Sequence, residues 1–551
     1  NVAVGQASLK ANTTGTRNLA VGRSALGSNT TGDYNSAGGM GALGDNTTAD
    51  NNTAFGYDAL ATNTTASNNT AVGKSALLLN TTGAENTAQG LNSLYSNTTG
   101  SSNVALGRSA LEANTTASNN TAVGRSALEA NTTGAGNVAV GRQALLVNTT
   151  AGSNTALGDQ ALNANTTGAS NTAVGSAALA SNTTAADNTA VGTSALISNT
   201  TGHSNVGVGK SALAANTTGS NHTAVGLGAM ISNTTGANNV AVGKSALDAN
   251  TTGANNAALG SDALGGLTTG SHNCAVGEQT MYVATTVNNT TGLGTQALWS
   301  LTTGNENTAV GRISMLYTTT GYENAALGYY SLRTNTTGHK NTALGTFSMG
   351  NNTTGVENTA VGHDSLYGNT TGTLNTAVGR SAGFGITNGS NNLVLGNGAG
   401  NAGSPSGGLT SQDHLICLGN NSITAAYIKA AWTVTSDQRD KADITDFTHG
   451  LDYINELRPV NYVWDERSNY ADGISDGSKK KDLPQLGFLA QEIEAVETSL
   501  GITNNCVVDK EDPEHLKITE TKLIPVLVNA IQELSTQNAA LAARLTTLEE
   551  G

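Results

Sequence analysis

The stretch Asn120-Thr-Ala-Val-Gly-Arg-Ser-Ala-Leu-Glu-Ala-Asn-Thr-Thr-Gly-Ala-Gly136 decides the fold, because it is one clean copy of a 17-residue unit that repeats from the first residue. Glycine occupies position five of every copy from Gly5 to Gly396. A short period held this long indicates one supersecondary unit stacked many times, as in a solenoid or fibre shaft. At about 4.8 Å per stacked strand, the 23 steps between these glycines predict a shaft of roughly 110 Å.

The apolar positions of the unit predict a narrow interior. Position nine is Leu or Met in every copy from Leu9 to Leu366, and the residue before it is always Ala, Ser or Thr. One large and several small side chains per coil suit a close-packed core. Position four is apolar in nearly every copy, so we expect this strand to turn that side chain inward; examples are Val4, Val21, Phe55, Val72, Leu106 and Val123.

Each copy is too short for a stable helix, since isolated helices under about 12 residues are marginal. One strand, one tight turn and a single helical turn at Ala-Leu are therefore expected. Stacking would align the Asn-Thr-Thr corners at Asn12, Asn29 and Asn46 into hydrogen-bonded ladders. The glycine at position five would serve a positive φ or a close backbone approach. The triplets also match glycosylation sequons, although a fixed repeat corner explains them without sugars.

Composition and charge exclude several classes of function. The net charge of −14 argues against a nucleic-acid partner, which needs clustered Lys and Arg. No stretch approaches the roughly 18 apolar residues of a membrane span. The histidines and the three cysteines, Cys274, Cys417 and Cys506, show no metal-ligand or disulfide spacing, so neither metal nor cofactor is expected. The chain starts in phase and without Met, which predicts a piece of something longer.

Two interpretations of the shaft stay open: pure structure, or a surface that binds a host receptor such as a glycan or a protein. An interrupted row of cations at position six favours the second; it comprises Arg23, Lys74, Arg108, Arg125, Arg142, Lys210, Lys244, Arg312 and Arg380. In four copies that also carry Tyr282, Trp299 and Tyr317, the Asn of position twelve is replaced, which indicates local repacking or a contact patch; the replacements are Leu267, Ala284, Leu301 and Thr318. A sugar-cleaving site needs two positioned acids, and the repeat supplies none.

The composition changes after Gly396. Residues 397–408 are rich in Gly, Asn and Ser and predict a flexible linker, while 414–419 and 423–435, with Trp432, predict short strands. Charges and helical patterns return at Ser436. The expected domains are a repeat shaft at 1–395, a linker with a short β segment at 396–435, and a third domain at 436–551.

Four motifs of the third domain follow one another in order. They are Ser436-Asp-Gln-Arg-Asp-Lys441, Gly450 to Trp464, Gly487-Phe-Leu-Ala-Gln-Glu-Ile493 and Lys522 to Leu534. Together they closely resemble the C-terminal intramolecular chaperone domain of phage endosialidases, tail spikes and tail fibres. The resemblance implies an α+β domain that trimerises, guides folding of the fibre and then removes itself by one round of autoproteolysis, without activity on external substrates.

The same resemblance assigns the cleavage residues. Ser436 is the nucleophile that attacks the carbonyl of Thr435, Lys441 is its general base, and Asp437 and Arg439 form a supporting ion pair. Serine needs a base within hydrogen-bond reach, and Ser-Lys pairs are a known form of this chemistry. From the residues alone, Ser436 as the N-cap of a helix and Asp437 and Arg439 as ordinary surface charges stay open.

A heptad pattern predicts a C-terminal coiled coil at 523–550. Its seam positions are Leu527, Ile531, Leu534, Asn538, Leu541, Leu545 and Leu548. A single amphipathic helix packed on its own domain is the alternative, and heptads do not count strands, so a homotrimer rests on the resemblance. The repeats are also similar to the trimeric β-roll heads of autotransporter adhesins, although the copies here are longer.

We therefore expect a mainly β protein: a 17-residue-repeat solenoid or β-roll shaft, trimeric by resemblance, followed by a chaperone domain. The function indicated is a viral tail fibre in the virion or extracellular space that recognises a host. A cell-surface adhesin or extracellular filament with the same chaperone domain is the alternative.

Overall fold

The computed structural model describes residues 1–423, 426–427, 429, 434–467, 470, 473–503, 507–510 and 516–550. The predicted strand around Trp432 and the residue Cys506 lie outside these ranges. The chain forms two compact units, one comprising Asn1–Leu393 and Ser411–Leu415, the other Val394–Thr410 and Ile416–Gly551. Each unit is described by itself.

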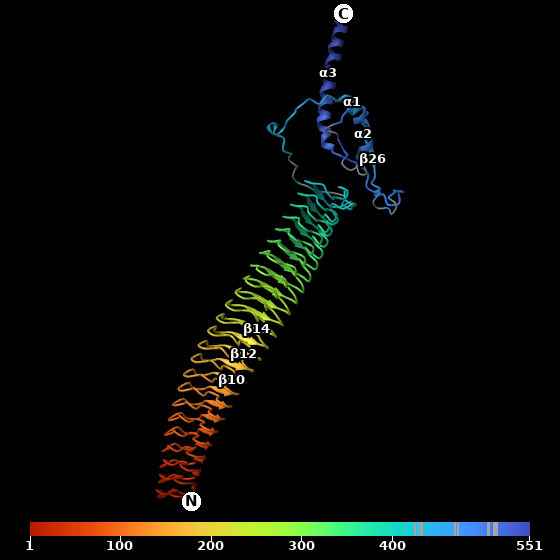
Figure 1. Ribbon diagram of the computed structural model, residues 1–551. Helices are drawn as coiled ribbons and strands as arrows, with labels where there is room; N and C mark the ends of the chain where they lie inside the picture. The colour runs from red at the N-terminus through yellow and green to blue at the C-terminus, as the bar shows by residue number, and fades with distance from the viewer. Residues whose placement is uncertain are drawn as a thin grey trace. The chain divides into compact units, whose positions relative to one another are not determined.

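The shaft is a parallel β-solenoid, as expected, built on one sheet of 25 three-residue strands (Figure 1). Neighbouring strands pair in register with a step of one copy, so that Val2 lies beside Leu19 and Ala3 beside Ala20. The strands are β1 (Val2–Val4), β2 (Leu19–Val21), β3 (Ser36–Gly38), β4 (Thr53–Phe55), β5 (Thr70–Val72), β6 (Thr87–Gln89), β7 (Val104–Leu106), β8 (Thr121–Val123), β9 (Val138–Val140), β10 (Thr155–Leu157), β11 (Thr172–Val174), β12 (Thr189–Val191), β13 (Val206–Val208), β14 (Thr223–Val225), β15 (Val240–Val242), β16 (Ala257–Leu259), β17 (Cys274–Val276), β18 (Thr291–Leu293), β19 (Thr308–Val310), β20 (Ala325–Leu327), β21 (Thr342–Leu344), β22 (Thr359–Val361), β23 (Thr376–Val378), β24 (Leu393–Leu395) and β25 (Ile416–Leu418).

The prediction that position four points inward is wrong. Position three is the buried one: Ala20 and Ala54 are fully buried, whereas Val21 and Phe55 at position four are 42% and 43% exposed. Successive strand side chains face opposite sides. A methyl group added at Gly207, a position-three glycine, would already lie 3.3 Å from Leu196 Cδ1. The leucine of position nine therefore limits the space that is left for the side chain at position three.

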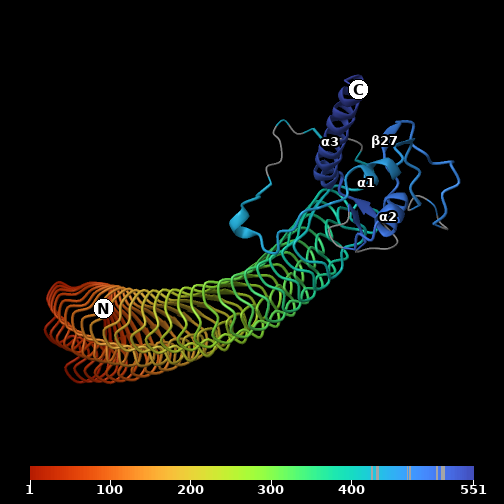
Figure 2. The same cartoon turned by 90° about the horizontal axis from the view of Figure 1, so that it is seen from above.

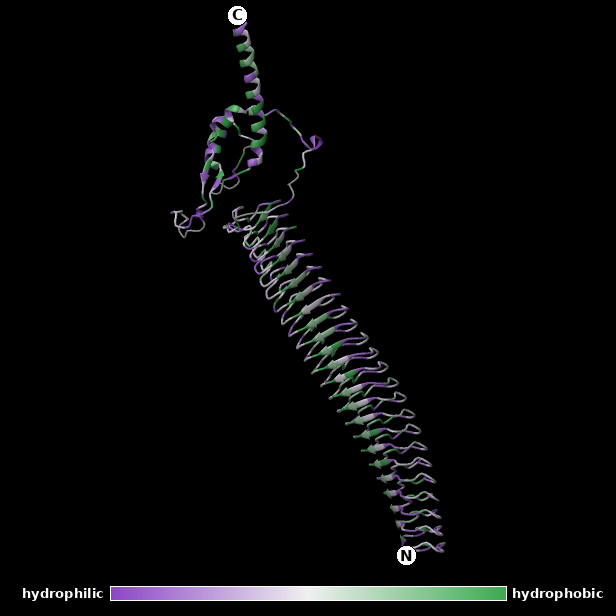
Figure 3. Cartoon of the chain, turned by 180° about the vertical axis from the view of Figure 1, so that it is seen from behind, coloured by the Kyte–Doolittle hydropathy of each residue, from purple (hydrophilic) through white to green (hydrophobic). Residues whose placement is uncertain are grey.

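Position nine supplies the large interior side chain, as predicted, but its backbone corrects the expected helical turn. Leu26 and Leu43 are fully buried, and their φ angles of 49° and 51° lie in the left-handed region. A right-handed helical turn needs negative φ. The Ala-Leu segment is instead a tight turn that aims leucine into the core. Figure 3 shows apolar strands on one side of each coil and more polar turns on the other.

Glycine at position five meets both demands predicted for it. Gly124 has φ of 133°, which disfavours any L side chain, and a Cβ there would collide with the carbonyl oxygen of Gly141 in the next coil. The same relation links each such glycine to its neighbour along the shaft, for example Gly22 to Gly39 and Gly192 to Gly209.

Two ladders of buried asparagines run along the shaft. At position twelve, as predicted, Asn29 Nδ2 donates to Asn12 Oδ1 (2.9 Å) and to the Gly32 carbonyl (3.1 Å). A second ladder, which was not predicted from the sequence, lies at position one. There the Asn35 backbone N–H donates to Asn18 Oδ1 (2.8 Å), and the Asn35 side chain donates to the Ala49 carbonyl (2.8 Å). Buried amides are tolerated because every coil satisfies the next.

The four successive copies without Asn at position twelve, from Leu267 to Thr318, show local repacking. Leu267, Ala284 and Leu301 are fully buried in the ladder's place. At the boundaries, Asn250 Oδ1 and Thr318 Oγ1 are buried without a hydrogen-bond partner among the described residues. An apolar segment therefore interrupts the polar ladder.

The segment expected to be a flexible linker consists of turns. Residues 397–408 form turns in which Ser404 is buried, and Ser404 Oγ donates to the Gly407 carbonyl (3.1 Å). After this segment the sheet continues with β25, so it extends past the predicted boundary at 395. The coil is lengthened: Leu415 N–H donates to Asn392 Oδ1, 23 residues earlier (2.9 Å).

The second unit carries the helices. Its elements after β25 are the 3₁₀ turn η1 (Gln438–Asp440), α1 (Leu451–Glu456), β26 (Val460–Tyr462), β27 (Gln485–Gly487), α2 (Ala490–Ser499), β28 (Val508–Asp509), β29 (Lys517–Ile518), the 3₁₀ turn η3 (Glu520–Lys522) and α3 (Leu523–Glu549). The strand pairs β26–β27 and β28–β29 are antiparallel. Its hydrophobic core consists of buried side chains from these elements and the segments between them: Tyr453, Ile493, Val496, Val507, Val508, Leu523 and Val526. Figure 2 shows α1, α2 and α3 of this unit from a second direction.

We predict that Gly124→Ala opens the shaft locally. The added methyl group meets the Gly141 carbonyl at an unfavourable φ, so the cost should be at least about 2 kcal/mol, and hydrogen-exchange protection of β8 and β9 should fall. Gly136→Asn is the matched control in the same copy, because its φ is 69° and nothing lies within 4 Å of an added Cβ. Equal protection in both variants would contradict this account of the repeat.

A buried histidine makes one coil sensitive to pH. His222 replaces Asn in the position-one ladder and is 1% exposed. Its Nε2 lies 2.6 Å from the Gly236 carbonyl, which only accepts, so Nε2 carries the proton and Nδ1 accepts from Asn239 N–H (3.3 Å). Burial lowers the pKa of this imidazole.

We therefore predict that the coils around His222 lose stability in acid. The unfolded chain binds a proton below about pH 6.5, while the folded chain resists it, so protection of β13 to β15 should fall as pH drops through that value and continue to fall until the lower folded-state pKa is passed. His222→Asn should remove this local dependence, and the exposed His203→Asn should leave it intact. Persistence of the dependence in His222→Asn would assign it to another group.

Candidate functional site

The predicted nucleophile and base lie together at the start of the second unit's helical part. Lys441 Nζ donates to Ser436 Oγ at 2.6 Å. The turn η1 brings them together, since Asp440 N–H bonds to the Asp437 carbonyl (3.2 Å) and Lys441 N–H to the Gln438 carbonyl (3.1 Å). A single 3₁₀ turn thus places two side chains five residues apart within hydrogen-bond reach.

The predicted supporting pair is also formed. Arg439 Nη2 contacts Asp437 Oδ2 at 2.6 Å, and Asp437 Oδ1 accepts from the Arg439 backbone N–H (2.9 Å). The hydrogen bonds from Arg439 lower the pKa of the Asp437 carboxyl. Asp437, and not Ser436, is the N-cap of η1, so the alternative role of Ser436 as a helix cap is wrong. The Ser436 hydroxyl instead accepts the hydrogen bond from Lys441 Nζ.

The loop is open to solvent. Thr435, Ser436 and Lys441 are all exposed. The bond between Thr435 and Ser436 is therefore reachable by water, and so is the amine beside it. The hydrogen-bonded serine-lysine pair is therefore formed in an exposed loop of the single chain.

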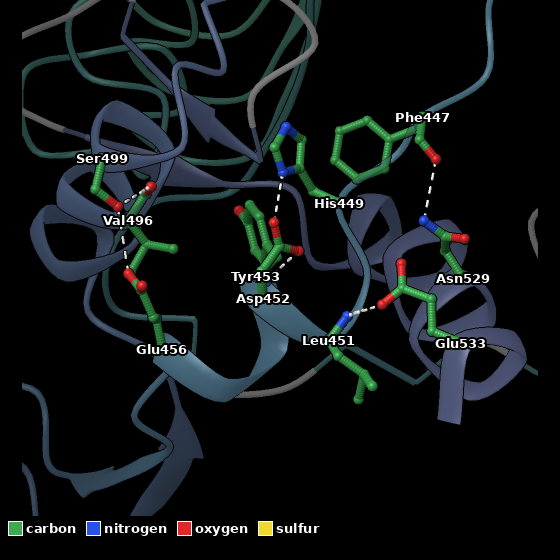
Figure 4. A network of polar contacts seen from close by, with 10 residues as sticks. All are labelled: Phe447, His449, Leu451, Asp452, Tyr453, Glu456, Val496, Ser499, Asn529 and Glu533. Carbon is green, nitrogen blue, oxygen red and sulfur yellow. Dashed lines mark hydrogen bonds and ion pairs between the residues drawn. The ribbon is translucent and has the colours of Figure 1, made fainter. Parts of the chain in front are cut away.

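A polar network joins the segment after this loop to α3 (Figure 4). Leu451 N–H donates to Glu533 Oε2 (2.8 Å), and Asn529 Nδ2 donates to the Phe447 carbonyl (3.0 Å). On the other side of α1, Ser499 Oγ donates to Glu456 Oε2 (3.3 Å). These partners lie far apart in sequence, so no sequence pattern predicted their contacts.

Two further contacts fix α1. A Cβ at Gly450 would lie 2.7 Å from Ala530 N, so glycine permits the close approach of α1 to α3. His449 Nδ1 lies 2.7 Å from Asp452 Oδ2, and this hydrogen bond lowers the pKa of the Asp452 carboxyl. The segment that follows the Ser436 loop therefore packs against α3.

Helix α3 is buried only in its first turns. Leu523, Val526 and Ala530 are buried against the unit's own core. The apolar seam residues lie beside this buried stripe and continue along the later turns of the helix, and their exposed fractions range from 44% to 77%; they are Leu527, Ile531, Leu534, Leu541, Leu545 and Leu548. Asn538 is exposed too. The domain's own packing therefore leaves the predicted seam uncovered.

Within the described part of the chain, no group of three or more His, Cys, Asp and Glu is arranged to hold a metal ion. Of the helices in those same ranges, none is long and apolar enough to cross a membrane.

A long parallel solenoid followed by a helical domain with a serine-lysine loop fits a tail-fibre-like structural protein. Residues 436–502 match the family described as chaperone of endosialidase, a peptidase family. This C-terminal part of the chain is thus similar to that family, with Ser436 as the first matched residue. Comparison with curated proteins gives no match. Comparison with solved structures gives none either.

Proposed function

We propose that this protein is an extracellular host-recognition fibre of the viral tail type, and that its C-terminal domain assembles the chain into a homotrimer and then cuts itself off between Thr435 and Ser436. The observation that carries the cleavage proposal is the 2.6 Å hydrogen bond between Lys441 Nζ and Ser436 Oγ. The family match begins at the same serine, which supports the assignment.

The chemistry requires only these two side chains and water. Neutral Lys441 accepts the proton of Ser436 Oγ as the oxygen attacks the Thr435 carbonyl carbon. The lysine then protonates the Ser436 nitrogen as the peptide bond breaks, leaving an ester between Thr435 and Ser436 Oγ. Water hydrolyses the ester, which frees the Thr435 carboxylate and regenerates the hydroxyl. Each chain is cut once.

Assembly supplies what the single chain lacks. Only a neutral amine accepts a proton, and burial is what favours that form. Because Lys441 is exposed in the single chain, partner chains that cover the loop would switch cleavage on. Cutting would then follow correct association and leave premature monomers intact.

Two uncovered apolar surfaces support association. One is the seam of α3 described above. The other is the outer row of the shaft sheet, where position four exposes Val, Leu or Phe in coil after coil, including Val72, Leu157 and Leu259. Rows of exposed apolar side chains this long are typical of contact surfaces, and identical chains offer them in equal spacing. The trimer number itself comes from the resemblance.

A cell-surface adhesin or other extracellular filament with the same domain is the second candidate. The similarity of the repeat to autotransporter adhesin heads favours it. The chaperone domain is common to both candidates, and the particle on which the fibre is found distinguishes them.

We predict that the wild-type chain, refolded and run on a denaturing gel, gives fragments that meet at the Thr435–Ser436 bond. Ser436→Ala should stay full length. Lys441→Arg keeps a hydrogen-bond donor but cannot lose its proton, so cleavage should slow at least about a hundredfold. Ser478→Ala, an exposed serine of the same domain, is the control. Full-length wild type, or cleavage in Ser436→Ala, contradicts the proposal.

We predict that a double variant with Leu534→Lys and Leu541→Lys no longer assembles and remains as single chains. Two added charges in each seam oppose association. Light scattering measures the chain number. Cleavage should fall in the same samples, since the loop stays uncovered. Gln537→Lys is the control on an exposed position outside the seam. A single-chain variant that cleaves at the wild-type rate would show that the loop needs no partner.

A further inference from the structure

Aromatic residues are unevenly distributed along the shaft. They make up 4% of the chain, yet nine of the thirteen in residues 1–395 lie between Tyr282 and Phe384. Most occupy positions six, seven, ten and eleven, which form the turn after the strand. The segment overlaps the copies whose asparagine ladder is interrupted, so both the interior and the surface depart from the repeat here.

Four of these aromatic residues and two arginines at the same corner form one connected surface, which we call the aromatic–arginine patch. The ring centroids of Tyr329 and Tyr330 are 4.2 Å apart, and those of Tyr330 and Phe347 are 5.4 Å apart. Arg333 lies over the rings of Tyr330 (4.8 Å) and Tyr317 (5.5 Å), and Arg312 lies over Tyr329 (6.0 Å). The patch thus comprises Arg312, Tyr317, Tyr329, Tyr330, Arg333 and Phe347.

The patch is a surface feature and contributes little to the core. Tyr317 and Tyr329 are 42% and 39% exposed. Tyr330 and Phe347 have φ of 60° and 59°, a conformation unfavourable for bulky side chains. At the same position other copies carry small or polar residues, such as Ser109 and Gln143. The repeat therefore does not require bulky rings at position seven, and their contacts are with one another on the surface of the corner.

The charge of the patch is opposite to that of the chain. In the copies spanning 307–374, this corner carries Arg312, Arg333 and His363 and a single carboxylate, Asp364, which pairs with His363 (2.7 Å). The chain as a whole has a net charge of −14. Arginine bound over a ring keeps its planar fork oriented, and that fork matches carboxylate geometry.

We propose that the aromatic–arginine patch binds an acidic polysaccharide. Flat rings on successive coils suit the apolar faces of successive sugar rings, and the two arginines suit carboxylates on them. The surface is a convex corner, which fits an extended chain better than a compact ligand. This inference deepens the recognition role proposed above by naming the receptor's chemistry and its site.

The test uses the full-length protein and titration calorimetry with oligogalacturonate. Malto-oligosaccharide of the same length is the neutral probe, and polyglutamate is the acidic polypeptide probe. We expect binding of oligogalacturonate that weakens with salt, and weaker or undetectable binding of the other two. Arg333→Gln and Tyr329→Ser should each raise Kd about tenfold or more. Tyr57→Ser is the matched control: Tyr57 also sits at position six, is 46% exposed and lies under a cation, Lys74, at 5.9 Å.

Several outcomes overturn the proposal. They are absence of oligogalacturonate binding, equal binding of either other probe, and unchanged affinity in both patch variants. If Tyr329→Ser lowers hydrogen-exchange protection of β19 and β20 while affinity is unchanged, the rings serve the fold alone. A change in chain number in Arg333→Gln would instead identify the patch as a contact between copies. Cleavage and chain number are measured on the same samples, so failure here is distinct from failure of the fibre proposal.

Discussion

The close approach of successive coils at position five is the constraint on which the rest of the shaft depends. From Gly5 to Gly362, each glycine there sits so near the next coil's carbonyl group that even one methyl group does not fit. That spacing brings the strands into register and lets the asparagine side chains of neighbouring coils bond to one another. Because all of these contacts link a coil only to its neighbours, stability is built one interface at a time.

This one-dimensional design gives a physical reason for the assembly role proposed for the C-terminal domain. Every coil resembles the next, so a pairing shifted by one copy satisfies nearly the same hydrogen bonds and buries nearly the same alanines and leucines. The repeat itself therefore specifies register weakly between chains. The helical unit has none of this ambiguity: its core and the contacts of Glu533 and Asn529 with the segment after Ser436 occur once per chain.

The departures from the repeat carry most of what is individual about this shaft. His222 in one ladder, the apolar run from Leu267 to Leu301 in the other, and the rings around Tyr329 each replace a residue that the fold alone would retain. The first changes the protonation chemistry of a coil, the second its interior, and the third its surface. A repeat tolerates such changes because each disturbs only adjacent coils.

The sequence by itself determined a stack of 17-residue coils, as a solenoid or a β-roll, together with the role of glycine, the large residue at position nine and the ladder at position twelve, because a strict period places identical residues above one another. Ser436 and Lys441 were identified as partners through the family resemblance of their motif, and the structure shows the short turn that brings the two side chains together. Only the tertiary structure decided which face of the strand is buried: a three-residue strand is too short for its alternation to be read, and the space left by Leu196 and its equivalents settles the matter. The structure likewise showed that the sheet continues to β25. It also showed the contact between α1 and α3, which the sequence could not indicate because the two contacting residues are 82 positions apart and leave no periodic signal.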